Sequence, residues 1–483
     1  MPGRRKPGER GRGRLVLIRN SAVGWELSSA ELNRGKVADD MQPPLFGKGG
    51  EIMQETIIRG LAQLATPKGK EARHGGAMQE LEVISDAAIW VENGVIRAAG
   101  KETVVLQEAM KNDLIAPALK GGQAEGVTII DGRGLCAVPG FIDPHTHFLF
   151  AGARAQEFDD RLAGVPYLTL LERGGGIVST MRSTRGASEE ALYAEGARTL
   201  RAMMALGVTT VEGKSGYGLD LETELRLLRV MHRLDRDLPT NVVVTYLGAH
   251  AVPPEYAGRG DDYVDFICRE MLPLIQRDHL AEFVDVFCET GVFTVSQTRR
   301  IFEAARELGF FLKLHADEMS STGGAELAAE VGAFSADHLL SVSEAGIASL
   351  AQSQTVAVLL PATAFCMRKP YAPARRLIEK GAAVALASDY NPGSCYTYSL
   401  PLVFALAVID MQMTVAEALT AVTLNAAAAI GRADCLGSLE PGKRGDIVLL
   451  AAPDYRYLSY KTGLNLVRTI LKDGIVVCGE VEV

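Results

Sequence analysis

The chain has 483 residues, 47% of them hydrophobic, and a formal net charge of −9 at pH 7. It has no uninterrupted run of about 18 apolar residues, which argues against a membrane span. The acidic balance disfavours nucleic acid as a partner, because phosphate binding needs a basic surface. The seven cysteines are scattered without a Cys-x-x-Cys pair, so they indicate reduced thiols in a cytoplasmic, soluble enzyme acting on a small molecule.

The first 53 residues differ in composition from the rest. Residues 1–14 hold many arginines and lysines and a single acidic residue, Glu9, with glycine and proline between them and no apolar segment after them. This composition is typical of a disordered extension, and a transit peptide or a nucleic-acid-binding arm is the alternative. Strand character begins just after Met53, so we predict a disordered extension over residues 1–53. We expect residues 1–52 to be a translated upstream stretch and Met53 to be the first residue of the native chain.

Residues 56–135 have the pattern of short strands separated by turns, including an Asn-Gly turn at residues 93–94. From residue 140 onward, strands alternate with long helical segments, which is typical of a parallel α/β barrel. Eight barrel strands are expected, at Phe141–His145, Val208–Glu212, Val242–His250, Phe283–Glu289, Phe311–His315, Ser335–His338, Val356–Pro361 and Val384–Asp389.

A last helix is expected at residues 414–431, and strand character returns in residues 437–450. We therefore predict an α/β fold with a TIM-like (β/α)8 barrel over residues 136–435. The segments 54–135 and 436–483 are expected to form one small β-sandwich domain, a pairing inferred from topology.

Five of the eight histidines fall at the ends of predicted strands, where the active-site groups of such a barrel lie. Alternate side chains of a strand point to the same side, so His145 and His147 can bind one metal ion. We assign four metal ligands, because three neutral imidazoles and a carboxylate suit one Zn²⁺ or Fe²⁺/Fe³⁺ ion with a position open for water. The four are His145, His147, His315 and Asp389.

Two further side chains are catalytic candidates. Glu318 follows His315 by three residues, where a carboxylate could move a proton between the water and a leaving nitrogen. His338 would orient that water or stabilise charge at the attacked carbonyl. A second metal would need a bridging ligand, such as a carboxylated lysine, at the end of the fourth strand. That strand has no lysine there, so one metal is predicted, with Glu289 as the alternative ligand for a second.

Several motifs resemble the amidohydrolase superfamily. They include residues 138–147, Val-Pro-Gly-Phe-Ile-Asp-Pro-His-Thr-His, the Ser-Asp pair at 388–389, and residues 437–448, Gly-Ser-Leu-Glu-Pro-Gly-Lys-Arg-Gly-Asp-Ile-Val. Further stretches narrow the resemblance to the imidazolonepropionase family, and the likeness runs from about residue 54 to the C-terminus. These stretches are residues 150–154, 174–177, 212–219, 248–250, 287–289 and 389–394.

This resemblance implies hydrolysis of the ring amide C–N bond of 4-imidazolone-5-propanoate to N-formimidoyl-L-glutamate, a step of L-histidine degradation. It implies that Arg154 binds the propanoate carboxylate, which suits the two-pronged geometry of a guanidinium. It also implies a homodimer with one zinc or iron ion per subunit. The remaining substrate-binding residues that it implies are Tyr217, His250, Glu318, Asn391, Gly393 and Ser394.

Two other interpretations stay open. Another mononuclear amidohydrolase or aminohydrolase, acting on a cyclic amide or a nucleobase, would use the same ligands. Arg154 and Tyr217 disfavour a nucleobase, because a nucleobase has no carboxylate to bind. A non-catalytic scaffold on the same barrel would have lost ligands, and this chain retains all four.

Overall fold

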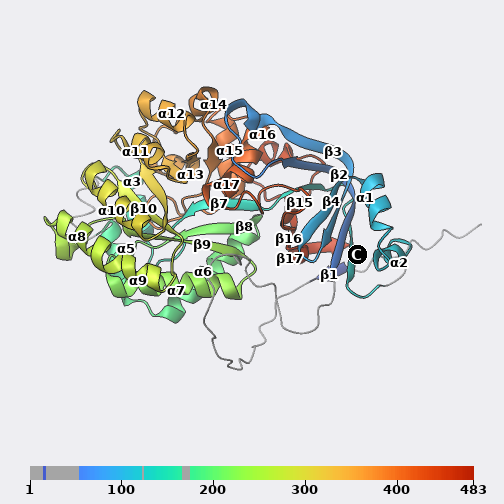
Figure 1. The fold of residues 1–483 in the computed structure, drawn as a ribbon, viewed down its shortest axis with the longest axis horizontal. Helices are drawn as coiled ribbons and strands as arrows, with labels where there is room; N and C mark the ends of the chain where they lie inside the picture. The colour runs from blue at the N-terminus through green and yellow to red at the C-terminus, as the bar shows by residue number, and fades with distance from the viewer. Residues whose placement is uncertain (1–14, 18–53, 122–123, 166–174, 483) are drawn as a thin grey trace, which may run out of the picture.

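The computed structural model describes residues 15–17, 54–121, 124–165 and 175–482, and in it a helix-covered barrel lies beside a smaller, mainly β part (Figure 1). The predicted N-terminal extension, apart from residues 15–17, lies outside the described residues. Within the described part, no helix has the length and apolar character needed to cross a membrane.

Eight parallel strands form the barrel, in the spatial order β14-β13-β12-β11-β10-β9-β8-β7. The predicted barrel is therefore confirmed, with strand ends that differ by a few residues from the expected ones. The bounds are β7 (Phe141–Thr146), β8 (Val208–Lys214), β9 (Asn241–Ala249), β10 (Phe283–Cys288), β11 (Phe311–Ala316), β12 (Ser335–His338), β13 (Val356–Leu359) and β14 (Val384–Leu386).

The barrel closes where the chain beyond β14 meets β7. The amide of Asp389 donates to the carbonyl of His145 at 3.1 Å, and the amide of His147 donates to the carbonyl of Tyr390 at 3.0 Å. Three of the four predicted metal ligands are therefore brought together by the closing contacts themselves.

Helices cover the outside of the barrel (Figure 1). The predicted single helix at 414–431 is wrong: α16 ends at Ala421 and α17 begins at Leu424, because Thr423 leaves helical geometry at φ −127° and ψ −92°. The helical segment between β9 and β10 is interrupted by a π-helical turn, η3 (Ile267–Met271). The remaining bounds are α3 (Ala155–Leu162), α5 (Ile177–Gly186), α6 (Glu189–Met204), α7 (Leu221–Asp237), η2 (Pro254–Tyr256), α8 (Gly260–Phe266), α9 (Leu272–Arg277), α10 (Val295–Glu307), α11 (Gly324–Val331), α12 (Glu344–Ala351), α13 (Pro361–Met367), α14 (Ala374–Lys380), α15 (Leu400–Ile409), α16 (Val415–Ala421), α17 (Leu424–Ala429) and α18 (Tyr457–Tyr460).

The N- and C-terminal segments share one sheet, as predicted, with the order β1-β17-β16-β15-β6-β2-β3-β4 and β5 paired to β2. The two segments meet where β6 pairs antiparallel with β15, Val138 opposite Val448. The exact domain boundaries stay a prediction. The bounds are β1 (Leu15–Leu17), β2 (Glu55–Pro67), η1 (Gly75–Gln79), β3 (Leu81–Glu92), β4 (Val95–Lys101), α1 (Glu102–Ala109), α2 (Ile115–Leu119), β5 (Val127–Asp131), β6 (Cys136–Pro139), β15 (Ile447–Leu450), β16 (Val467–Lys472) and β17 (Ile475–Glu482).

A bulge in β2 lets this sheet enclose a core of its own. The register of β2 against β3 shifts between Ile58 and Leu61, where Gly60 adopts φ +74°, a left-handed conformation that favours glycine. Residues of both halves of the sheet, among them Ile58, Ile89 and Leu471, then pack in one apolar cluster. The small domain is thus stabilised by burial that requires both ends of the chain.

Gly140 joins the two parts of the molecule, because β6 of the small sheet runs through it directly into β7 of the barrel. Its amide donates to the carbonyl of Asp446 at 2.9 Å, and a Cβ at this position would collide with the side chain of Thr209. Glycine is therefore required here, and the strand that carries His145 and His147 is anchored in both domains.

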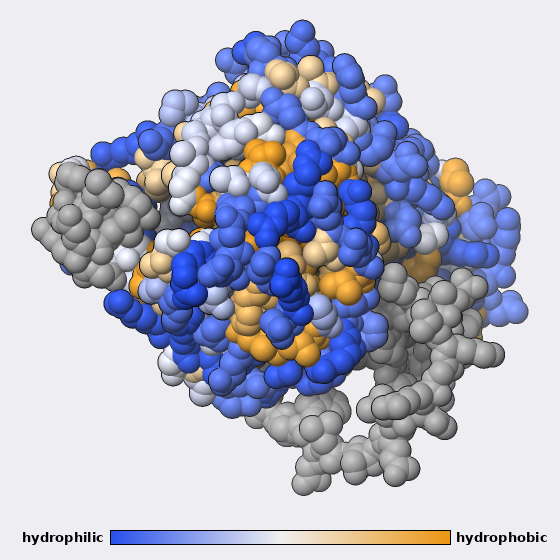
Figure 2. Space-filling view, turned by 60° about the vertical axis from the view of Figure 1, so that its left-hand side comes forward, coloured by the Kyte–Doolittle hydropathy of each residue, from blue (hydrophilic) through white to orange (hydrophobic). Residues whose placement is uncertain are grey.

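The surface of the barrel seen in Figure 2 is mostly hydrophilic, with hydrophobic side chains gathered in patches. Three of the large exposed hydrophobic residues, Met319, Phe365 and Tyr396, follow β11, β13 and β14. Apolar surface therefore borders the end of the barrel at which the strands terminate.

Candidate metal centre and active site

The four predicted metal ligands converge on one point. The Nε2 atoms of His145 and His147 each lie 3.5 Å from Oδ1 of Asp389, and Nε2 of His147 lies 3.3 Å from Nε2 of His315. Ligands bound tetrahedrally at about 2.0–2.2 Å are about 3.3–3.6 Å apart, so these separations match those around one metal ion. All four residues are at most 2% exposed.

Two carboxylates orient the imidazoles toward this point. Oδ2 of Asp337 lies 2.6 Å from Nδ1 of His145, and Oδ2 of Asp285 lies 2.9 Å from Nδ1 of His315. A carboxylate that accepts the Nδ1 proton leaves the lone pair of Nε2 free to bind a metal. Several lone pairs that face one another in a buried site need a cation between them, so the donor set fits a metal ion.

The protonation states also suit metal binding. Burial, reinforced by neighbouring cations and imidazoles, lowers the pKa of His145 and of His147 well below the ordinary value, so both are neutral near pH 7. Burial raises the pKa of Asp389 to about 6, which still leaves its carboxylate largely ionised at neutral pH. Metal ligands must be deprotonated, and these three side chains meet that requirement. His315 differs, because burial lowers its pKa but the carboxylate of Asp285 raises it above the ordinary value.

Backbone strain accompanies two site residues. Asp389 has φ +52° and His338 has φ +76°, in the left-handed region that non-glycine residues rarely adopt. Thr363 donates its hydroxyl to Oδ2 of Asp389 at 2.7 Å, which leaves Oδ1 directed toward the histidines. His338 also lies close enough to His145 and His315 to form a second group of metal-ligand type, so it borders the same point.

A network of buried charges contacts the histidines of the site, and the sequence pattern did not predict it. Nζ of Lys214 lies 2.7 Å from Asp285, 2.9 Å from Glu212 and 3.5 Å from Asp337, all fully buried. Lys313 adds a second ammonium group 3.2 Å from Glu212. The available signal was the presence of charged residues inside the predicted barrel strands, now β8, β10, β11 and β12.

The ammonium groups of Lys214 and Lys313 take the place that a second metal ion would have in the barrel interior. His145, Glu212 and Asp337 form another group of metal-ligand type, but Lys214 lies within 2.9 Å of Glu212. Although burial lowers the pKa of Lys214, the carboxylates of Asp285, Glu212 and Asp337 raise it above its ordinary value, so the side chain stays charged. The lysines therefore supply the positive charge that these carboxylates need.

Glu318 lies beside the donor set, with Oε1 3.7 Å from Nδ1 of His338. Burial, together with the negative charges of Asp389 and Glu289, raises the pKa of Glu318 to about 8. A carboxyl group with a pKa near neutrality can both accept and return a proton, which is what a general acid–base group requires.

His250 and Tyr217 line one side of the site. The ring of His250 stacks on that of His147, with centroids 5.0 Å apart and an interplanar angle of 17°. The ring of Tyr217 lies 5.9 Å from that of His147 and 5.3 Å from that of His250. The Nδ1 atom of His250 is 3.1 Å from the carbonyl of Gly216, which fixes the orientation of the ring.

The loop after β14 brings the remaining predicted residues to Arg154. Asn391 accepts from the amides of Gly393 and Ser394 at 2.8 and 2.7 Å, and donates to the Asp389 carbonyl and the Ser394 hydroxyl. A Cβ on Gly393 would come within 2.5 Å of Nη1 of Arg154, so glycine makes room for the guanidinium. The hydrogen bonds of Asn391 are thus made within the loop, and a direct contact of its side chain with substrate stays a prediction.

Arg154 itself is 13% exposed and contacts Glu157, with Nε and Nη2 both 2.9 Å from the same carboxylate oxygen, Oε2. The guanidinium thus lies between an acidic side chain and the loop that carries Gly393. This arrangement fits an anion-binding group at the edge of the site.

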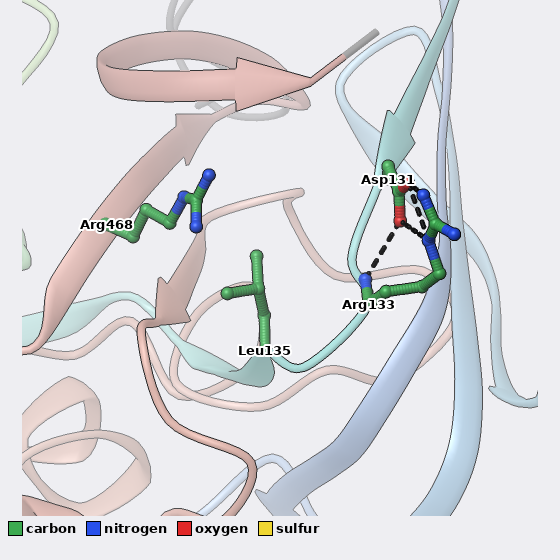
Figure 3. A pocket seen from close by; sticks show the side chains of 4 residues that line it. All are labelled: Asp131, Arg133, Leu135 and Arg468. Atoms are coloured by element: carbon green, nitrogen blue, oxygen red, sulfur yellow. Dashed lines mark hydrogen bonds and ion pairs between the residues drawn. The ribbon is translucent and has the colours of Figure 1, made fainter. Parts of the chain in front are cut away.

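A separate pocket of about 250 Å³ lies in the small β domain (Figure 3). Asp131, Arg133, Leu135 and Arg468 line it, and none of the predicted site residues does. The guanidinium of Arg133 turns to Asp131, with Nε 2.8 and 3.0 Å from the two carboxylate oxygens. This pocket is distinct from the histidine site.

The chain is similar in sequence to proteins of a known family. Residues 136–479 match the amidohydrolase family. The chain is also 52% identical to a curated imidazolonepropionase of Porphyromonas gingivalis over 422 residues, 87% of this chain and 96% of the relative. The chain belongs to the amidohydrolase family. A curated imidazolonepropionase of Clostridium tetani is 49% identical over 421 residues, 87% of this chain and 97% of the relative.

Solved structures agree on the fold of this amidohydrolase. A zinc-bound adenosine deaminase from Xanthomonas campestris superimposes with a TM-score of 0.62, covering 88% of this chain and 93% of its own, at 18% identity. An atrazine chlorohydrolase from Arthrobacter aurescens, complexed with zinc, gives 0.61 over 88% of this chain and 95% of its own, also at 18% identity. Likeness at this level of identity shows the fold alone.

Replacing Lys214 by methionine should destabilise the protein strongly. The change keeps the apolar stem but leaves Asp285, Glu212 and Asp337 without their shared cation, and removing one partner of a buried ion pair costs about 3–5 kcal/mol. Urea unfolding should show a lower midpoint at an unchanged slope. Lys111→Met, at an exposed position, is the control, and equal midpoints for the two variants would contradict the role of Lys214.

Proposed function

We propose that the protein hydrolyses the ring amide C–N bond of 4-imidazolone-5-propanoate to N-formimidoyl-L-glutamate. The observation that carries this proposal is about 50% identity, over most of the chain, to several curated imidazolonepropionases. The barrel supports it chemically, because a buried set of three imidazoles and a carboxylate next to an acid–base carboxyl group is suited to amide hydrolysis.

His145, His147, His315 and Asp389 would hold the metal. A divalent cation bound by such ligands lowers the pKa of water toward about 7 and polarises carbonyl oxygens. Zinc and iron both stay candidates, because a set of three imidazoles and a carboxylate suits both ions.

Glu318 and His338, which lie beside the metal donors, carry out proton transfer and charge stabilisation. Glu318 takes a proton from the water that attacks the ring carbonyl carbon and delivers it to the ring nitrogen as the C–N bond breaks. His338 stabilises the negative charge that develops on the carbonyl oxygen. Their separation of 3.7 Å lets both reach one reacting centre, and the raised pKa of Glu318 suits a group that must return its proton.

Arg154 binds the propanoate carboxylate of the substrate, and Tyr217 and His250 contact its ring. In this proposal Asn391 acts by holding the loop that places Gly393 and Ser394 beside Arg154. A negatively charged substrate tail can share the guanidinium with Glu157 or displace it, since Nη1 of Arg154 faces Gly393 rather than Glu157.

Cytoplasmic location and a homodimer stay predictions. The seven cysteines are all free in the structure, which supports a reducing compartment. The dimer rests on the family resemblance alone.

Mixing the purified protein with fresh 4-imidazolone-5-propanoate tests the function directly. We expect loss of its ultraviolet absorbance and formation of N-formimidoyl-L-glutamate, abolished by a chelator and restored by added Zn²⁺ or Fe²⁺. Turnover of guanine or cytosine by metal-replete protein, with none of the imidazolone, would favour a nucleobase aminohydrolase instead.

Glu318→Gln should keep the metal and lose most of the activity. Glutamine has nearly the same size but cannot accept the proton, so kcat should fall by about 10²–10⁴-fold. Metal content by elemental analysis should stay at one ion per subunit. Glu303→Gln, at an exposed position on α10, serves as the control, and near-normal turnover of the Glu318 variant would remove Glu318 from the mechanism.

Arg154→Met should raise KM far more than it lowers kcat. Losing a charged hydrogen bond to the substrate carboxylate costs about 1.5–3 kcal/mol, or roughly 10- to 100-fold in KM. Steady-state kinetics would be compared with those of Arg182→Met, an exposed arginine on α5. An unchanged KM would show that the carboxylate binds elsewhere.

A further inference from the structure

The loop that carries Glu318 has little apolar burial to hold it in place. Met319, the next residue, is 63% exposed, and Ser321 is exposed as well. Residues 317–322 contain neither helix nor strand. A mobile loop would place the Glu318 carboxyl group poorly, so polar contacts must fix its position.

Asp317 holds the far side of this loop. Its carboxylate accepts hydrogen bonds from the amides of Thr322 at 2.8 Å, Gly323 and Gly324 at 3.2 Å, and Ala325 at 3.0 Å. These contacts fix the start of α11 against the residue that precedes Glu318. They do not reach the two peptide groups directly after Glu318.

Glu289, just beyond the end of β10, binds those two peptide groups. Its Oε2 accepts from the amide of Met319 at 2.8 Å and from that of Ser320 at 3.1 Å. Its Oε1 accepts from the amide of Thr290 at 2.7 Å and from the hydroxyl of Ser320. Glu289 is 2% exposed, so these contacts are shielded from water and correspondingly strong.

We propose that Glu289 is a positioning residue, which anchors the Met319 and Ser320 amides and thereby aims Glu318 at the reacting centre. This inference rests on the proposed function for what Glu318 does, while the anchoring itself does not depend on the substrate. It also replaces the interpretation of Glu289 as a ligand for a second metal, because both of its oxygens are occupied by loop donors. The negative charge of Glu289 also contributes to the raised pKa of Glu318.

A double-mutant cycle tests this role. Glu289→Ala should lower kcat by about 10- to 100-fold with KM and metal content unchanged, because small displacements of a catalytic group cost about that much. The kcat of Glu289→Gln should lie between those of the wild type and Glu289→Ala, since the glutamine amide oxygen can still accept from both loop amides. In the Glu318→Gln background, Glu289→Ala should change turnover by less than about 2-fold, because the group that it positions is gone.

Hydrogen exchange measured by mass spectrometry gives a readout independent of turnover. Peptides that contain residues 319 and 320 should exchange fastest in Glu289→Ala and at an intermediate rate in Glu289→Gln, whose neutral amide oxygen is a weaker acceptor than the carboxylate. Ser321→Ala, in the same loop, should leave exchange at these amides and kcat unchanged. The exchange measurement does not depend on the substrate. If the imidazolone is not the substrate, only the kinetic measurements have to be repeated with another substrate.

Three outcomes would overturn the proposal. Unchanged exchange at residues 319 and 320 would remove the anchoring. An equal fall of kcat in the wild-type and Glu318→Gln backgrounds would show that Glu289 acts independently of Glu318. Two metal ions per subunit in the wild type and one in Glu289→Ala would make Glu289 a metal ligand. Because Glu289→Gln preserves size and two acceptor contacts, it keeps the test valid if the alanine variant folds poorly.

Discussion

Charge inside the barrel is the constraint on which this structure depends. Glu212, Lys214, Asp285, Lys313 and Asp337 are all fully buried, and an isolated buried charge is very costly. Each therefore lies within hydrogen-bonding or ion-pairing reach of another, and the network ends at Nδ1 of two histidines. The same balance that makes the interior stable therefore fixes the direction of the imidazole nitrogens of the candidate metal site.

The barrel strands and the loops that follow them contribute different groups to the site. The strands and the residues directly after them supply the donors, and the strands supply the charge network. Main-chain pairing and the closure between β7 and the chain after β14 fix their geometry. The loops supply Arg154, Glu318 and the turn at Asn391, each held by carboxylate or amide side chains that accept backbone amides or guanidinium groups. Loops that must hold precise positions without much apolar burial depend on such polar anchors.

The small β domain is coupled to the site through the chain itself. Because β6 continues through Gly140 into β7, the strand of His145 and His147 begins in a sheet that contains both terminal segments. The apolar core of that sheet therefore restrains the first strand of the barrel. Ile447 and Val448 pair with Pro139 and Val138 in this sheet, so the C-terminal segment also restrains the start of β7.

The sequence by itself determined the barrel, its eight strands and the residues that converge at its end as candidate metal ligands, because strand–helix alternation and placement at strand ends are local patterns. It did not reveal the partners of those residues. Asp337 lies 192 residues from His145, and Lys214 lies 71 residues from Asp285. Nor did it show that the oxygens of Glu289 bind loop amides, or that Asn391 binds its own turn. Only the tertiary structure decided these contacts, since hydrogen bonds between distant segments depend on which side chains the folded barrel brings within about 3 Å.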